Sequence, residues 1–159
     1  MSITEERQKV VNFTDPYYSN KLQYVGKKGT PLDITPAGLK GKSVGAQRAT
    51  IAAEWLEKNA PGVATKLYDT QENAWLDLDA GRTDAVLADV FLSYDWLQSP
   101  TGKNFEYKGD PVFDDDKIGI AVRKQDTALL ARLNTALKTI IDNGTYAKIN
   151  AKYFPFSIR

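Results

Sequence analysis

Short apolar runs alternate with amphipathic segments along most of the chain. Runs typical of buried strands occupy residues 43–47, 63–68 and 84–88, and each is bounded by glycine, proline or polar turn residues. Between the first two runs, apolar residues recur at helical spacing at Ile51, Ala52, Trp55 and Leu56. Strands that alternate with helices predict βαβ units, a mostly parallel sheet and an α/β fold.

The same reading predicts the remaining elements of the chain. It places helices at 4–11, at about 70–80, at about 90–97 and at 145–153, and extended runs at 22–25, 105–107 and 118–122. Ser2 with Glu5, and Asp69 with Glu72, fit capping boxes, although Thr4 competes for the first cap. A long amphipathic helix is predicted from its apolar stripe, whose members are Leu129, Leu130, Leu133, Leu137, Ile140 and Ile141.

The length and net charge of the chain limit the classes of function that it can have. The 159 residues suffice for one ordinary domain or two small lobes. Because 21 Lys and Arg residues oppose 20 Asp and Glu residues, the net charge of +1 gives no basis for nucleic-acid binding. No apolar run approaches the ~18 residues of a membrane span, and residues 1–8 contain no secretory signal.

Two residue types are absent from the chain. Without histidine there is no Ser-His-Asp or Cys-His nucleophile system and no His-ligated metal. Without cysteine there are no disulfides, zinc ribbons or iron–sulfur clusters. We therefore predict no metal and no cofactor.

Two apparent motifs do not support a site. Gly41-Lys42-Ser43 looks like the end of a phosphate loop, but Pro36 stands where that loop needs its first glycine. Residues 114–116 form an acidic run that lacks the spacing of an EF-hand, so we predict a solvated acidic turn.

Three residues each have a structural and a functional interpretation. Asp89 ends a buried strand, where α/β sheets bind ligands, but the same position fits the N-cap of the next helix. Thr50 fits an N-cap and also an anion-binding helix N-terminus. Arg7, on a surface-like helix, is by default a solvated cation.

Several segments together resemble one family, the bacterial solute-binding proteins that serve as receptors of polar amino-acid ABC importers. The lysine/arginine/ornithine, histidine and opine subgroup is the most similar. The segments keep the family's order and compatible spacing over essentially the whole chain. They are MSITEERQ (1–8), VNFTDPYY (11–18), LKGKSVG (39–45), AGRTDAVLAD (80–89), IGIAVRK (118–124), GTYAKI (144–149) and KYF (152–154).

The resemblance implies a type II periplasmic binding protein-like fold, in which two α/β lobes joined by two crossover strands hold the ligand between them. It implies a remnant of lobe one at 1–21, a complete lobe two with hinge strands at 22–122, and C-terminal helices of a partial lobe one at 123–159. Arg7 resembles the residue that pairs with the ligand α-carboxylate, assisted by Ser2. Thr50 and Ile51 match the helix N-terminus that closes on that carboxylate, and Asp89 resembles the acceptor of the α-ammonium.

The chain departs from the family pattern in two respects. Ala49 stands where the family usually has glycine, and Arg48 stands where it usually has a small polar residue, which predicts an altered or occluded cleft mouth. The resemblance also implies that the chain starts within lobe one, without the opening segment that reads the ligand side chain. The residues present therefore leave open which basic or polar amino acid is bound.

Three functions follow from these observations. The first is an amino-acid receptor of an ABC importer, or part of one, in the periplasm, with the importer's membrane subunits as partners of the full-length form. The second is a folded, ligand-free scaffold. The third, implied by the resemblance because some relatives on this scaffold are dehydratases, is an enzyme acting on cyclic acids. It is the least favoured because no paired carboxylates provide an acid and a base. Because the Leu129–Ile141 stripe would lack its usual sheet, we also predict a homodimer.

Overall fold

The computed structural model describes all 159 residues and divides into two compact units. Unit 1 comprises Met1–Asn20 and Asp115–Arg159, and unit 2 comprises Lys21–Asp114. The resemblance implied lobe boundaries at residues 22 and 122, and unit 2, as defined by contacts within the structure, runs from Lys21 to Asp114. Each unit is described by itself below.

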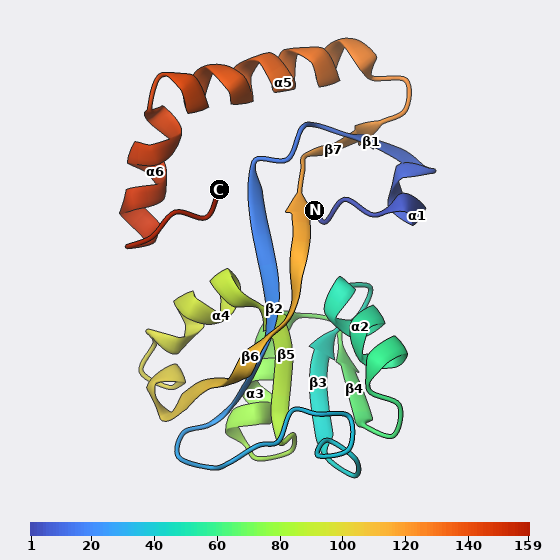
Figure 1. The fold of residues 1–159 in the computed structure, drawn as a ribbon, viewed down its shortest axis with the longest axis vertical. Coiled ribbons are helices and arrows are strands. Elements are labelled where there is room, and N and C mark those ends of the chain that lie inside the picture. The colour runs from blue at the N-terminus through green and yellow to red at the C-terminus, as the bar shows by residue number, and fades with distance from the viewer. The chain divides into compact units, whose positions relative to one another are not determined.

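Unit 2 is built on a five-stranded sheet of order β4-β3-β5-β2-β6 (Figure 1). β3 pairs in parallel with β4 and β5, whereas β2 pairs antiparallel with β5. The sheet is therefore mixed, with the predicted parallel part at its β4-β3-β5 side. Its elements in chain order are β2 (Tyr18–Lys27), β3 (Ser43–Gln47), α2 (Ile51–Asn59), β4 (Ala64–Tyr68), α3 (Gln71–Asp79), β5 (Ala85–Asp89), α4 (Val90–Leu97), η1 (Gly102–Asn104) and β6 (Phe105–Ile118).

Side-chain alternation along β5 divides the core of unit 2 between the two faces of the sheet. Leu87 faces a cluster that includes Leu56 of α2, whereas Val86 faces a cluster that includes Trp75 of α3. Helices thus cover both faces, with α3 behind the sheet in Figure 1. All four residues from Ala85 to Ala88 are buried, as the apolar run predicted.

The three tryptophans lie on the helices that cover this sheet, Trp55 on α2, Trp75 on α3 and Trp96 on α4. Trp75 and Trp96 stack with ring centroids 4.4 Å apart and an interplanar angle of 10°. The ring centroids of Phe105 and Trp96 lie 5.2 Å apart, and those of Trp55 and Tyr24 lie 6.2 Å apart in an edge-to-face contact. These large rings contribute much of the apolar area that unit 2 removes from water.

Unit 1 contains a two-stranded sheet, in which β1 and β7 pair antiparallel, and three helices. Its buried apolar side chains are Ile118 and Val122. None of the residues of α5 is buried, although its apolar residues form the predicted stripe. The elements are α1 (Glu5–Gln8), β1 (Val11–Phe13), β7 (Ala121–Arg123), α5 (Thr127–Asp142) and α6 (Thr145–Tyr153).

The structure corrects two local predictions and decides a third in favour of Thr4, the alternative cap of the first helix. The first helix ends at Gln8 rather than at residue 11, because Val11 begins β1 and pairs with Arg123. Thr4 and Thr70 are the N-caps, accepting bonds from the backbone N–H groups of Arg7 and Asn73, so neither capping box forms.

The predicted acidic turn at 114–116 is also wrong. These residues continue β6, which runs unbroken to Ile118. The Asp116 side chain is 3% exposed, and its Oδ2 accepts a 3.0 Å hydrogen bond from Asn20 Nδ2 on β2. Pairing between residues distant in sequence thus holds this polar run in a strand. No helix in the chain combines the length and apolar character that crossing a membrane requires.

Candidate ligand-binding site

Three helices of unit 2 begin at one edge of its sheet. β3, β4 and β5 run parallel, so their carboxyl ends meet at that edge, and α2, α3 and α4 follow them there (Figure 1). The first turn of a helix has N–H groups without intrahelical partners and the positive end of the helix dipole. This edge is therefore suited to binding an anionic group.

Asp89 is the last residue of β5 and the N-cap residue of α4. Its side chain makes no capping hydrogen bond, which argues against the purely structural interpretation. The residue is half-buried and pairs with Leu22 of β2 in the sheet. A carboxylate thus lies at the end of a buried strand, beside the N-terminus of α4.

Thr50 caps α2, as its sequence position predicted. Its hydroxyl accepts a bond from the Ala53 backbone N–H at 3.4 Å and donates to the Gln47 carbonyl at 2.7 Å. The side chain is therefore occupied by the cap. The next backbone N–H groups, beginning with that of Ile51, are the ones that a helix N-terminus offers to a ligand.

Arg7 and Ser2 lie close together in unit 1. Arg7 Nη1 donates a 3.1 Å hydrogen bond to the Ser2 carbonyl, and Ser2 forms a bridge with Ile118. Thr4 caps the single turn of α1 that carries Arg7. Arg7 is half-buried, so it is not the fully solvated cation of the default interpretation.

The predicted residues therefore form two groups. The structure brings Arg7 and Ser2 together in unit 1, and it places Thr50, Ile51 and Asp89 at one sheet edge in unit 2. No group of three or more Asp and Glu side chains is arranged to hold a metal ion, and we assign no cofactor residues.

Sequence reasoning missed one residue that supports this edge. The Tyr107 hydroxyl donates a 2.7 Å hydrogen bond to the Val90 carbonyl, directly after Asp89. Burial raises the pKa of Tyr107 to about 12, and the negative charge of ionised Tyr94 acts in the same direction. Nothing in the local sequence pattern predicts this contact, because Tyr107 is a strand residue 17 positions from Val90.

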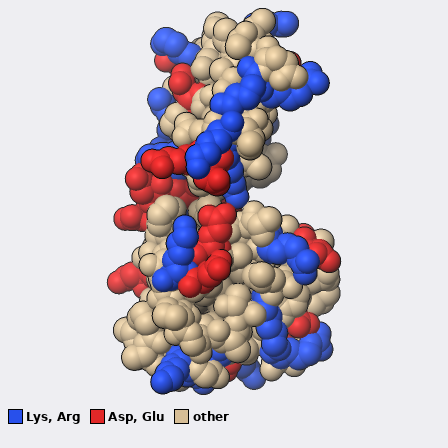
Figure 2. Space-filling model, turned by 90° about the vertical axis from the view of Figure 1, so that its right-hand side faces the viewer, with Lys and Arg blue, Asp and Glu red and all other residues tan.

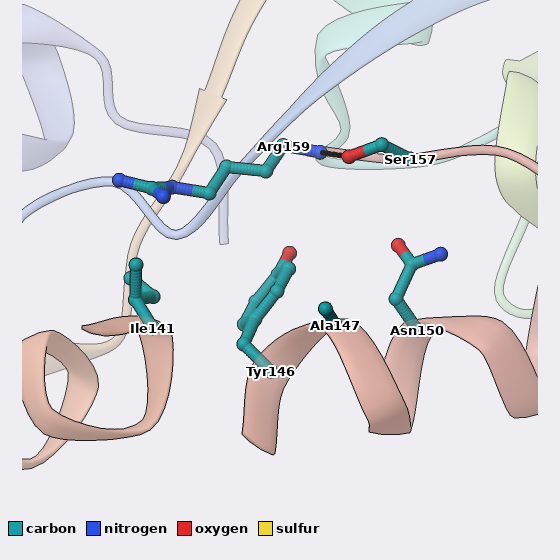
Figure 3. Close-up of a pocket in the computed structure, with 6 residues that line it drawn as sticks. All are labelled: Ile141, Tyr146, Ala147, Asn150, Ser157 and Arg159. Carbon is teal, nitrogen blue, oxygen red and sulfur yellow. Dashed lines mark hydrogen bonds between the residues drawn. The ribbon is translucent and has the colours of Figure 1, made fainter. Parts of the chain in front are cut away.

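A separate cavity of about 230 Å³ lies in unit 1 and contains none of the predicted ligand residues. Tyr146 and Asn150 rise from α6 toward the C-terminal segment that carries Ser157 and Arg159 (Figure 3). The Asn150 amide donates to Phe156 O at 2.6 Å and accepts from Ile158 N at 3.1 Å. Asn150 therefore fastens the C-terminal segment to α6.

The surface charge agrees with the balanced composition. On the face of unit 2 that Figure 2 presents, basic and acidic side chains adjoin one another and no continuous basic stripe runs across it. Within unit 2, ion pairs join Lys42 to Asp84, Arg48 to Asp69 and Arg82 to Asp77. This face therefore lacks the electrostatic footprint of a nucleic-acid interface.

Known proteins match the chain along almost its entire length. The family model of bacterial extracellular solute-binding proteins, family 3, matches residues 1–156. ABC transporter arginine-binding protein 1 of Escherichia coli is 41% identical over 157 residues, which are 98% of this chain and 64% of that protein. The lysine/arginine/ornithine-binding periplasmic protein of the same organism is 38% identical over 168 residues, with 99% of this chain and 64% of that protein covered.

Solved structures also match the chain along almost its entire length. An ancestral arginine-binding protein bound to arginine matches with a TM-score of 0.89 and 36% identity, over 97% of this chain and 69% of that one. The chain spans 64% of the length of the curated relatives described above. By the family match over residues 1–156, the chain belongs to the bacterial extracellular solute-binding proteins of family 3.

Proposed function

We propose that the chain is the amino-acid-binding component of an ABC importer, or a part of that component, and that it works in the periplasm. The names of its relatives support this proposal. The observation that carries it is the placement of the Asp89 carboxylate at the same sheet edge as the N-terminus of α2. An amino acid presents one cation and one anion, and this edge offers an opposite partner to each.

Each proposed contact follows from the chemistry of its group. Asp89 accepts hydrogen bonds from the ligand α-ammonium, and the first N–H groups of α2, at Ile51, bind the α-carboxylate. Arg7 binds the same carboxylate, because a guanidinium fork matches the two carboxylate oxygens. Thr50 shapes the helix end, and Ser2 assists Arg7. Under this proposal, units 2 and 1 correspond to lobe two and a partial lobe one.

The proposed ligand is a free basic or polar amino acid, and L-arginine is the first probe because two relatives are named for binding it. Calorimetry with L-arginine, L-lysine, L-histidine and L-glutamine measures whether the chain binds any of them. No heat of binding to any member of this panel would favour the alternative of a folded, ligand-free scaffold.

The test of Asp89 compares two carboxylate variants. Asp89→Ala is expected to weaken binding about 30-fold, or ~2 kcal/mol, because it leaves the desolvated ammonium without its partner. Asp95→Ala removes an exposed carboxylate from the same helix and serves as the control, with unchanged affinity. Equal affinities of the Asp89 variant and the wild type would remove Asp89 from the site.

A binding role is preferred over a catalytic one. Asp89 is the one carboxylate that we assign to the site, so no second acid or base stands ready for a dehydration. Formation of product from a cyclic acid substrate would reverse this preference. In the full-length form, the membrane subunits of the importer are the proposed partners, and a second copy of the chain is the proposed partner of α5.

A further inference from the structure

The connection between β3 and α2 has an unusual backbone. Ala49 has a φ of +57°, in the left-handed region that residues with a Cβ atom rarely adopt. It immediately precedes Thr50, the cap of α2. A strained residue persists where its surroundings hold it in place, so the neighbouring contacts of this connection are informative.

Arg48 supplies those contacts. Its Nε lies 2.9 Å from Asp69 Oδ1, and its Nη2 approaches the Leu67 carbonyl at 3.5 Å. The Arg48 backbone N–H donates to the Tyr68 carbonyl at 2.9 Å. The preceding side chain adds a further bond, from Gln47 Nε2 to the Asp69 carbonyl at 3.2 Å. A backbone hydrogen bond, side-chain hydrogen bonds and the ion pair thus hold the β3–α2 connection against the end of β4.

The ion pair is too exposed to contribute much to global stability. Arg48 is 58% exposed and Asp69 is 76% exposed, and pairs of this kind are weak. The larger expected effect is local. Because these contacts lie directly beside the strained residue, they restrain the conformation of residues 48–50. Holding a binding loop in its bound conformation lowers the entropy lost on binding.

We infer that Arg48 is a positioning residue, which fixes the β3–α2 connection through Asp69 so that the first N–H groups of α2 are preset for the ligand carboxylate. This inference rests on the proposed function. It replaces the expectation that Arg48 occludes the binding site with a role in organising it. Arg48 itself makes no contact with the ligand in this arrangement.

Affinity measurements test the link to the carboxylate. Arg48→Ala is expected to weaken L-arginine binding about fivefold, the upper range for an exposed ion pair. L-argininamide, which lacks the carboxylate, is expected to bind both proteins alike. Lys42→Ala is the matched control, because it breaks an ion pair with Asp84 in which both side chains are exposed and which lies at the start of β3, away from its connection to α2. An equal loss for both ligands would show a general structural defect and overturn the inference.

Hydrogen exchange separates failure of this inference from failure of the proposed function. The Ala53 N–H, which bonds to Thr50 Oγ1, is expected to exchange about fivefold faster in Arg48→Ala and in Asp69→Ala, and at the wild-type rate in Lys42→Ala. Faster exchange in the Arg48 and Asp69 variants supports the conclusion that this ion pair restrains the β3–α2 connection, even if no amino acid binds the wild type. Unchanged exchange overturns it, and faster exchange with unchanged L-arginine affinity overturns the positioning role.

Discussion

The Tyr107 hydroxyl on β6 donates a hydrogen bond of 2.7 Å to the carbonyl of Val90, the first residue of α4. This bond ties the first turn of α4 to a neighbouring segment of unit 2. Because Asp89 directly precedes Val90, the same bond restrains the carboxylate proposed to bind the ligand. A residue outside the proposed contacts thereby shapes the binding edge.

Removing this hydroxyl tests its contribution. Tyr107→Phe is expected to destabilise the chain by ~1 kcal/mol, because the half-buried hydrogen bond is lost without replacement. Urea denaturation measures the change. Tyr153→Phe is the control, because Tyr153 is 70% exposed, and it is expected to leave the free energy of unfolding unchanged. A Tyr107 variant as stable as the wild type would show that the bond adds nothing.

The stability of the chain is expected to fall at alkaline pH. Burial raises the pKa of Tyr107 to about 12, above the value near 10 of a phenol in the unfolded chain. Between these two values, the unfolded chain releases a proton that the folded chain retains, so rising pH favours unfolding. Denaturation measured from pH 9 to 12 should show this fall, with a smaller slope in Tyr107→Phe. An equal slope in both proteins would contradict the assignment to Tyr107.

The cap of α2 is expected to contribute to the stability of the chain. Thr50→Ala removes the hydroxyl that accepts the Ala53 N–H, with an expected loss of ~1 kcal/mol in the free energy of unfolding. Thr50→Ser retains a hydroxyl and is expected to retain most of the stability. Urea denaturation compares the two variants. A serine variant as unstable as the alanine variant would show that the threonine methyl, rather than the cap, is important.

The Trp75–Trp96 stack is expected to dominate the core on the α3 side of the sheet. Trp75 is 4% exposed, and Trp75→Ala is expected to cost ~3–5 kcal/mol, with loss of the near-ultraviolet dichroism of the coupled rings. Leu76→Ala, on the exposed side of the same helix, is expected to change stability by less than ~0.5 kcal/mol. Comparable losses in both variants would contradict this packing.

The sequence predicted the elements whose structure depends on local pattern. The strand at Ser43–Gln47 and the helix at Ile51–Asn59 agree with the structure, because their apolar spacing and flanking turns act over a few residues. Asp89 was correctly placed at a strand end for the same reason.

Long-range pairing explains the features that the sequence did not predict. The polar run 114–116 has no strand pattern, and its place in β6 depends on pairing with β2 and on contacts such as the bond between Asp116 and Asn20. Similarly, Val11 becomes a strand residue through its pairing with Arg123. The contact between Arg48 and Asp69 joins two connections that are 21 residues apart and was likewise invisible in the local pattern.

The apolar side of α5 predicts self-association of the chain. None of its residues is buried, and Leu129 is 46% exposed, although apolar side chains recur along one side of the helix. The two-stranded β1–β7 sheet also has both of its outer edges unpaired within unit 1. The other five residues of the stripe are partly exposed, and a second copy would cover them symmetrically together with the strand edges.

Light scattering over a tenfold dilution measures this association. The expected mass is twice the chain mass of 17.7 kDa at high concentration. Leu133→Lys combined with Leu137→Lys places two charges on the stripe and is expected to yield the monomer, because burying them in an interface is costly. Ala131→Lys with Thr135→Lys carries the same charges at the same spacing on exposed positions and should remain a dimer. A mass of 17.7 kDa for the wild type at every concentration would instead show that α5 stays uncovered by a second copy.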